Sequence, residues 1–281
     1  MILIADSGST KCDWVLCDEK YNIIKHYNTK GLNPYFVDKK TIIEELNKID
    51  LIKTTNKVRQ IYFYGSGCYL EEQKNVIKKH LKSFFLNSEI TIRHDLEASC
   101  YAFYKNKPNI TCILGTGSNS CFVENKEIIR TKPSLGFLLG DEASGSFFGK
   151  KILQYYFNNK LTKDLKKELE SNFITDYKII IEKIYNNNRP NMFLAKYFPF
   201  VSENKHHPLI RDLINSSLKD FFDLSIACFT KHKDFKINFS GSVAFYLRQE
   251  IKELLESKKC FLGDIIKNPL KELVNNHFKN K

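Results

Sequence analysis

The sequence has no apolar run long enough to cross a membrane and no sign of an N-terminal leader. Its first apolar segment is five residues long, ends at Asp6 and has no basic segment before it. A membrane-spanning helix needs about 20 consecutive apolar residues, and no stretch of the chain approaches that length. These absences predict a cytoplasmic protein with no membrane partner.

Paired cysteines are also absent. The eight cysteines are scattered without a C-x-x-C spacing, and most of them lie in apolar surroundings. This pattern excludes the usual zinc and disulfide frameworks, and it predicts reduced thiols that pack as small apolar side chains.

Arginine is scarce, although the chain is strongly basic. Only six of the 44 basic residues are arginine, and the formal net charge is +12. Surfaces that bind nucleic acids favour arginine because its guanidinium group makes two hydrogen bonds at once to phosphates and bases. The lysines are dispersed along the chain, so we interpret them as a solvated surface that helps to attract an anionic substrate, and we expect no nucleic-acid partner.

The pattern of apolar residues predicts an α/β fold. At 281 residues and 42% hydrophobic, the chain is long enough for two domains. Strand-like and helix-like segments alternate in its first part, which implies a mixed sheet covered by helices. The later part is mostly helical. The expected strands cover residues 1–5, 13–17, 21–26, 59–67, 89–95 and 109–114, and the expected helices 38–53, 70–86, 96–106, 150–187 and 209–233, with a strand, a turn and a helix over 236–247.

The pattern of the N-terminus returns in the middle of the chain. MILIADSGSTKCDWVLCD and NITCILGTGSNSCFVENKEIIR both contain an apolar strand, a Gly-Ser turn and a second strand. So few identities can arise by chance, but the shared context indicates a duplication, and we expect two similar domains, residues 1–108 and 109–281. Three residue pairs are each 109 positions apart: Gly8 and Gly117, Ser9 and Ser118, and Cys12 and Cys121.

Three short turns rich in Gly, Ser and Thr follow predicted strands, at residues 8–11, 115–118 and 240–242. Glycine lets a backbone N–H come close enough to a phosphate oxygen to donate to it. The sequence contains neither G-x-x-x-x-G-K-[ST] nor G-x-G-x-x-G, and the first two turns lead into strands rather than helices. Any one of these turns is typical of an ordinary hairpin, whereas the three together favour a site for nucleotide phosphates.

Four segments, taken in chain order, resemble the motifs of a known superfamily. ADSGSTK, ILGTGSNS, GDEASGSFFG and FSGSVA are similar to the phosphate-1, phosphate-2, acidic and adenosine motifs of the actin-like sugar kinases. The resemblance is nearest to the N-acetylglucosamine kinase branch, which shares a family with the BadF/BcrA-type ATPases. It implies two actin-like (ribonuclease H-like) domains around a nucleotide and sugar cleft, with a helix-rich second domain, and it implies ATP and Mg²⁺ as cofactors.

The resemblance also implies roles for two acidic residues that follow strands. Asp6 would hold the magnesium–nucleotide complex through water, since hard oxygen ligands suit Mg²⁺; local sequence alone allows it equally to cap a turn. Asp95 would be the general base that accepts the proton of the attacking sugar hydroxyl, although local sequence favours it as a helix N-cap and His94 as a structural residue. The nucleotide would contact Gly8, Ser9, Thr10, Lys11, Gly115, Thr116, Gly117, Ser118, Gly241 and Ser242.

The residues implied for the sugar come from both halves of the chain. Asp141 would accept a hydrogen bond from a sugar hydroxyl, and Glu142 would cap the helix that follows. The animal enzyme of the family that this chain resembles carries a tryptophan directly before the glycine that is Gly136 here, and this chain has Leu135 instead. Sugars often stack on aromatic rings, so this departure leaves the identity of the sugar open. The implied set is Asn33, Gly65, Ser66, Gly67, Asp95, Gly117, Gly136 and Asp141.

Together these expectations describe an ATP-dependent kinase that phosphorylates the 6-hydroxyl of N-acetylglucosamine or a related amino sugar. A second interpretation is a BadF-type ATPase that activates a dehydratase; such proteins hold an iron–sulfur cluster with paired cysteines, and the cysteines here are unpaired. A third is a sugar sensor without catalysis, which would need a DNA-binding extension before the first strand. The helix-rich segment 150–235 could form a homodimer surface, although nothing in it requires one.

Overall fold

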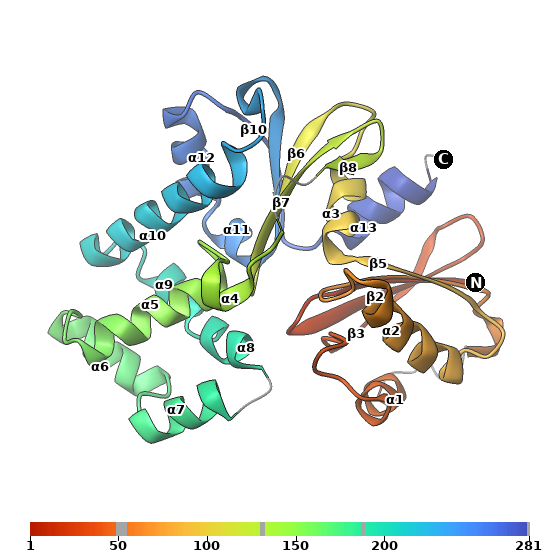
Figure 1. Ribbon diagram of the computed structural model, residues 1–281, viewed down its shortest axis with the longest axis horizontal. Coiled ribbons are helices and arrows are strands. Elements are labelled where there is room, and N and C mark those ends of the chain that lie inside the picture. Colours follow the sequence, from red (N-terminus) through yellow and green to blue (C-terminus); the bar gives the residue numbers. More distant parts are fainter. Residues whose placement is uncertain (49–54, 130–132, 187–188, 280–281) are drawn as a thin grey trace. The chain divides into compact units, whose positions relative to one another are not determined.

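The computed structural model describes residues 1–48, 55–129, 133–186 and 189–279. The chain forms two compact units, the first made of residues 1–107 and 268–281 and the second of residues 108–267. Each unit contains one five-stranded sheet, so the predicted α/β class is confirmed (Figure 1). The last parts of two expected helices, residues 49–53 and Asn187, and Arg130 at the end of the repeated segment lie outside the described residues.

The sheet of the first unit has the strand order β3-β2-β1-β4-β5. Its central strand runs antiparallel to β2 and parallel to β4, so the first three strands form a meander and the last two follow as crossovers. The order of strands and helices agrees with the order expected from the sequence. The strands are β1 (Ile2–Ser7), β2 (Lys11–Cys17), β3 (Ile23–Lys30), β4 (Gln60–Gly65) and β5 (Glu89–His94).

The central strand of this unit is apolar because helices cover the sheet. Leu3 and Ala5 are fully buried in one cluster with Ile42 of α1 (Lys39–Asn47) and Ile77 of α2 (Glu71–Phe84). Helix α3 (Asp95–Phe103) packs against β1, β4 and β5. A strand covered on both faces reads as a continuous apolar run, whereas the edge strand β3 alternates between buried and exposed residues.

The C-terminal residues of the chain pack on the first unit, although the sequence analysis assigned them to the second domain. Helix α13 (Leu270–Leu273) lies against α3, β1 and β2, and a π-helical turn (Val274–Lys279) follows it. The ring of Phe278 stacks on Tyr21 at 5.1 Å. Apolar spacing shows that such a segment must be covered, but it does not show which sheet covers it.

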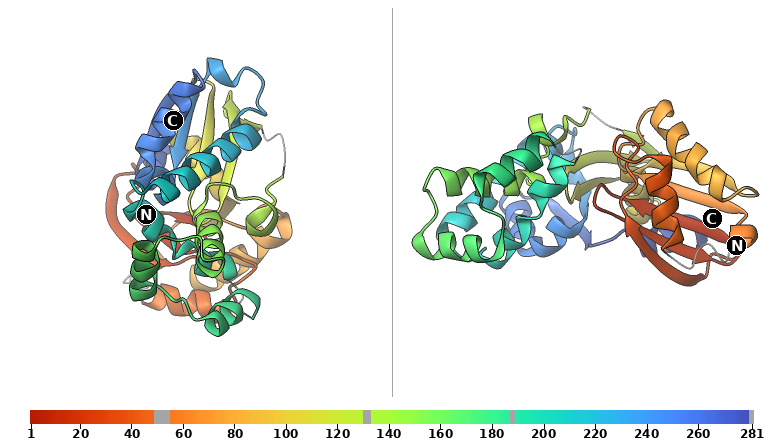
Figure 2. Two further views of the ribbon diagram at one scale, coloured as in Figure 1. Left: turned by 90° about the vertical axis from the view of Figure 1, so that its left-hand side faces the viewer. Right: turned by 90° about the horizontal axis from the view of Figure 1, so that it is seen from below.

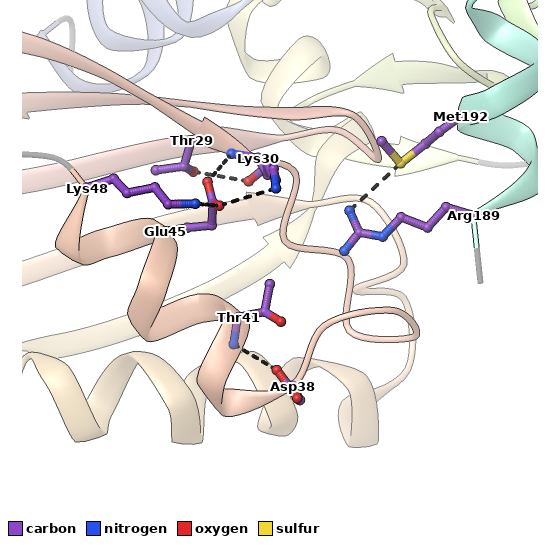
Figure 3. A network of polar contacts seen from close by, with 8 residues as sticks. All are labelled: Thr29, Lys30, Asp38, Thr41, Glu45, Lys48, Arg189 and Met192. Carbon is purple, nitrogen blue, oxygen red and sulfur yellow. Dashed lines mark hydrogen bonds and ion pairs between the residues drawn. The ribbon is translucent and has the colours of Figure 1, made fainter. Parts of the chain in front are cut away.

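The ion pairs of Glu45 fasten α1 to the neighbouring edge strand (Figure 3). Its carboxylate is almost fully buried, accepts a hydrogen bond from the backbone N–H of Lys30 at 2.9 Å, and lies 2.6 Å from Nζ of Lys48. Burial opposes the charge, but these donors hold the pKa of Glu45 below its ordinary value. The helix begins at Asp38, whose side chain accepts from the N–H of Thr41 at 2.7 Å.

The sheet of the second unit repeats the topology of the first. Its order is β10-β9-β6-β7-β8, so an antiparallel meander is again followed by two parallel strands. The repeated order agrees with the duplication inferred from the Gly-Ser segments. The strands are β6 (Asn109–Leu114), β7 (Ser118–Glu124), β8 (Glu127–Ile129), β9 (Lys236–Ser240) and β10 (Phe261–Ile266).

Helices make up most of the second unit, as the sequence predicted for residues 150–235. The apolar faces of α5, α8, α9, α10 and α12 close over one core, while α6 and α7 lie at the end of the unit remote from its sheet (Figures 1 and 2). In the described part of the chain, no helix combines the length and apolar character that crossing a membrane requires. The helices are α4 (Gly136–Leu139), α5 (Gly145–Phe157), α6 (Lys163–Asn172), α7 (Tyr177–Tyr185), α8 (Pro190–Ala195), α9 (Phe198–Glu203), α10 (Pro208–Phe221), α11 (Ser242–Tyr246) and α12 (Arg248–Ser257).

Gly149 is the point where α5 and α8 touch, and it provides a test of this packing. A side chain there would collide with the carbonyl oxygen of Leu194. We expect Gly149→Ala to lower the free energy of unfolding by about 1–3 kcal/mol, as overpacking does, although alanine favours a helix over glycine by about 1 kcal/mol. Urea denaturation measures the change, and Gln154→Ala, on an exposed part of α5, is the control. A Gly149→Ala protein as stable as the wild type would contradict the close contact.

Candidate active site

The first glycine turn joins β1 to β2 and is supported by the end of β4. The N–H of Ser66 donates to the carbonyl of Ser7 at 2.8 Å, and the hydroxyls of Ser66 and Ser9 lie 3.4 Å apart. Ser7 is fully buried, and its hydroxyl accepts from the N–H of Leu32 at 2.9 Å. The turn at residues 8–11 is therefore held from two sides by backbone that comes from later in the chain.

Asn33 and the glycine segment after β4 lie together beside this turn. The amide nitrogen of Asn33 donates to the hydroxyl of Ser66 at 3.4 Å, while Oδ1 accepts from the N–H of Tyr35 at 3.0 Å. Gly67 has φ +79°, and a side chain there would lie 2.6 Å from Oδ1 of Asn33. Gly65, at the end of β4, is crowded by the Phe63 ring. The structure thus brings Asn33 and Gly65–Gly67 to one place, as a shared ligand site would require.

Gly31 makes the approach of this segment to the first turn possible. Its N–H donates to the carbonyl of Thr10 at 3.0 Å, and a side chain at this position would collide with the carbonyl groups of Gly8 and Ser9. Sequence reasoning missed Gly31 because a glycine before Leu-Asn-Pro is also typical of an ordinary loop.

Three carboxyl groups influence one another near the first turn. Asp6 and Asp13 are directly opposite in the register of β1 and β2, and Asp13 pairs with Lys11 at 2.7 Å. Burial raises the pKa of Asp6 from 3.8 to about 8; the charges of Asp95 and Asp13 add to the rise, and Lys11 opposes it. Sequence reasoning missed Asp13, although a tight hairpin after Asp6 predicts the pairing.

Asp95 is the first residue of α3, and the cap of that helix is its neighbour His94. Nδ1 of His94 accepts from the N–H of Leu96 at 3.2 Å, and Glu97 Oε1 accepts from the N–H of His94 at 3.1 Å, which together form a capping box. Oδ1 of Asp95 also accepts from the Leu96 N–H, at 2.8 Å, and lies 3.0 Å from His94 Nδ1. Local sequence favoured Asp95 as the N-cap, but His94 fills that role. This agrees with the expectation that His94 is a structural residue.

The second glycine turn joins β6 to β7 and rests on the start of α5. The N–H of Gly145 donates to the carbonyl of Gly115 at 2.8 Å, and the N–H of Ser146 donates to that of Thr116 at 3.1 Å. Ser144 caps the helix, since its hydroxyl accepts from the N–H of Phe147 at 3.2 Å. The expectation that Glu142 caps it is wrong, because the helix begins two residues later. The first amides of α5 thus hold the turn itself.

Asp141 lies directly against the second turn. Its Oδ1 accepts a hydrogen bond from the N–H of Ser118 at 3.1 Å, and a side chain at Gly117 would lie 2.9 Å from its Oδ2. Asp141 has φ +57°, a left-handed conformation that is uncommon outside glycine. The carboxylate is thus aimed at the turn rather than extended into solvent.

The third turn meets the second one. Gly241 has φ +113°, and a side chain there would collide with the carbonyl of Leu114 and lie 3.2 Å from the nitrogen of Gly115. Ser242 follows as the first residue of α11. The carbonyl of Gly136 accepts from the N–H of Gly140, the residue before Asp141, at 2.9 Å. A side chain at Gly136 would meet no atom within 4 Å, and Leu135 before it is 57% exposed.

The expected site residues therefore fall into one group in each unit. The first group has Asp6, Gly8–Lys11, Asn33, Gly65–Gly67 and Asp95, and the second has Gly115–Ser118, Gly136, Asp141, Gly241 and Ser242. Within the described residues, no three His, Cys, Asp or Glu side chains are grouped so that they could hold a metal ion directly.

Comparisons with known proteins agree on the architecture. No protein-family model matches the sequence, and neither does any curated protein. A presumed N-acetylglucosamine kinase from Porphyromonas gingivalis is 30% identical, with a TM-score of 0.90 over 100% of this chain and 99% of its own. Another from Chromobacterium violaceum is 14% identical, with a TM-score of 0.73 over 98% and 97% of the two chains.

A ROK-family glucokinase from Streptomyces griseus, solved with glucose and AMPPNP, shares the fold at 13% identity, with a TM-score of 0.55 over 98% of this chain and 97% of its own. Since the similarity to the P. gingivalis protein extends over essentially all of both chains at 30% identity, this chain belongs to the N-acetylglucosamine kinase-like family of the actin-like sugar kinases.

Proposed function

We propose that the protein is an ATP-dependent kinase that phosphorylates the 6-hydroxyl of N-acetylglucosamine or a related amino sugar in the cytoplasm. The observation that carries this proposal is the position of Asp95, which follows β5 at the start of α3 while His94 fills the capping role. In open α/β sheets, ligands bind at the carboxyl ends of strands. Family membership supports kinase chemistry, and the name of the P. gingivalis protein supports the choice of sugar.

The glycine turns fit the phosphates of a nucleotide. A side chain at Gly8 would meet only the carbonyl of Lys11, at 3.8 Å, and one at Gly115 would meet no atom within 4 Å. The space beside Gly8 and Gly115 is therefore open, so phosphate oxygens can approach the backbone at these two positions. In this proposal Ser9, Thr10 and Lys11 bind on the first unit, and Thr116 to Ser118 with Gly241 and Ser242 bind on the second.

The acidic groups beside the first turn fit a magnesium ion. Asp6 is opposite Asp13, and its pKa is raised to about 8 by burial and by neighbouring carboxylates. A divalent cation would offset this negative charge, and oxygen ligands suit Mg²⁺, which keeps several of its waters. We assign Asp6 to the ion, held through water, where Mg²⁺ would neutralise charge on the transferred phosphoryl group.

In the proposed reaction, Asp95 accepts one proton. The sugar 6-oxygen forms a bond to the γ-phosphorus of ATP, the bond from that phosphorus to the bridging oxygen breaks, ADP leaves, and the hydroxyl proton moves to the Asp95 carboxylate. Asn33, Ser66, Gly67 and Asp141 would orient the sugar. Seven of the eight cysteines are buried and none forms a disulfide, and burial does not favour the alternative of an activator that holds an iron–sulfur cluster.

Asp95→Asn tests the assignment of the base. We expect turnover to fall by about 10²–10⁴-fold, since the amide cannot accept the proton. Binding of magnesium–AMPPNP should stay within about twofold of the wild type, a difference of only about 0.4 kcal/mol. ADP release with a panel of sugars measures turnover, and calorimetry measures binding. Asp38→Asn is the control, since asparagine also caps a helix. Near-normal activity of Asp95→Asn with any sugar of the panel would refute the assignment.

Asp6→Asn tests the electrostatics of the magnesium site. The folded-state pKa of about 8 lies above the unfolded value of 3.8, so stability from this group is complete below pH 3.8 and is lost as the pH rises towards 8. In EDTA, we expect the variant to melt at a higher temperature than the wild type at pH 8, with the difference smallest near pH 4. Thermal melts across this range measure it, with Glu19→Gln as an exposed control. A pH-independent difference would rule out the raised pKa.

A further inference from the structure

The hydrogen bond between Asp141 and Ser118 joins the acidic loop to the second glycine turn. Oδ1 accepts from the Ser118 N–H at 3.1 Å, and Oδ2 lies 2.9 Å from the position that a side chain on Gly117 would take. The carboxylate therefore lies over the Gly117–Ser118 peptide. In the proposed function the N–H of Ser118 is one of the donors for the nucleotide phosphates.

A phosphate and the Asp141 carboxylate compete for this donor. A single N–H donates strongly to only one acceptor at a time, and two anions that share one donor repel each other strongly where little water separates them. A nucleotide phosphate can therefore bind Ser118 fully only after Asp141 has moved away. In this structure, the Asp141 carboxylate occupies the acceptor position at the Ser118 N–H that a phosphate oxygen would take.

The loop holds Asp141 in this position at a conformational cost. Asp141 and Ala143 both have φ +57°, a left-handed backbone conformation that is unfavourable for residues other than glycine. Two backbone hydrogen bonds fix the loop. After Asp141 in the chain, the N–H of Ser144 donates to the Asp141 carbonyl at 3.1 Å, and before it the N–H of Gly140 donates to the Gly136 carbonyl at 2.9 Å. The side chain is thus positioned by the backbone around it.

The turn itself would keep its shape when Asp141 leaves. Its carbonyl groups at Gly115 and Thr116 are bound by the first amides of α5, independently of Asp141. Gly241 also packs against the carbonyl of Leu114 at the end of β6. The Ser118 donor is therefore already oriented for a new acceptor.

We propose that Asp141 blocks the Ser118 donor until sugar hydroxyls draw its carboxylate away, so that sugar binding strengthens nucleotide binding. The inference rests on the proposed function and deepens it: neutral hydroxyls donate to a carboxylate, whereas phosphates repel it. Asp141 is then a positioning residue that couples the two substrates. The coupling also disfavours the binding and hydrolysis of ATP when no sugar is present.

Calorimetry with magnesium–AMPPNP, with and without saturating N-acetylglucosamine, tests the coupling. For the wild type, we expect the sugar to tighten nucleotide binding by about fivefold or more, within the usual range of coupling between sites. Without sugar, Asp141→Ala should bind the nucleotide about fivefold or more tighter than the wild type, and added sugar should then change this affinity less than about twofold. Asp141→Asn, which keeps an acceptor without its charge, should fall between them. Glu142→Gln, the neighbouring acid, is the control and should behave as the wild type.

Two outcomes would overturn the inference alone: a folded Asp141→Ala protein whose sugar-free nucleotide affinity equals that of the wild type, or a variant that keeps the full effect of sugar. If Asp141→Ala does not fold, the Asp141→Asn protein takes its place. The inference is then overturned if Asp141→Asn binds the nucleotide as the wild type does, both with and without sugar. A wild-type protein that binds no nucleotide under either condition would instead overturn the proposed function, and the inference with it.

Discussion

Close contacts between backbones at glycine residues determine where the turns of the candidate site stand. Gly31 lets the segment after β3 lie on the carbonyl groups of Gly8 and Ser9, and Gly241 lets the end of β9 touch the carbonyl of Leu114. A side chain at either glycine would push the two backbone segments apart, beyond the distance that a hydrogen bond can span. Each turn is therefore held by a partner distant in sequence, and its N–H groups point in fixed directions, as an anion site needs.

The two units use the same strand order but stabilise their turns differently. In the first unit, the backbone after β4 donates to Ser7, so the turn is held by the sheet itself. In the second unit, the first amides of α5 bind the turn carbonyls. This difference leaves carboxylates with different surroundings: Asp6 is crowded by other acids, whereas Asp141 has a backbone N–H as its partner. The same strand order thus carries two turns whose neighbouring carboxylates have unlike surroundings.

Much of the fold could be predicted from the sequence, because its signals are local. The pattern of apolar residues indicated the order of the strands in the first unit, and helical spacing indicated that residues 150–235 are mostly helical, but not where α5, α6 and α7 begin and end. The capping of α3 could not be predicted in the same way, since histidine is not among the residues that usually cap a helix N-terminus. Nor did apolar spacing show that residues 268–281 return to the first unit. Apolar spacing shows that a helix face is buried, whereas the element that covers it depends on how the whole chain packs.

The sequence by itself determined the strand-turn-strand segments, their order and the chemical groups that they carry. Only the tertiary structure decided that the Asp141 carboxylate reaches Ser118, 23 residues earlier in the chain, and that Asn33 reaches Ser66, 33 residues later. The physical reason is that short-range patterns fix how a segment folds, whereas contacts between distant segments depend on how the packed elements bring their ends together.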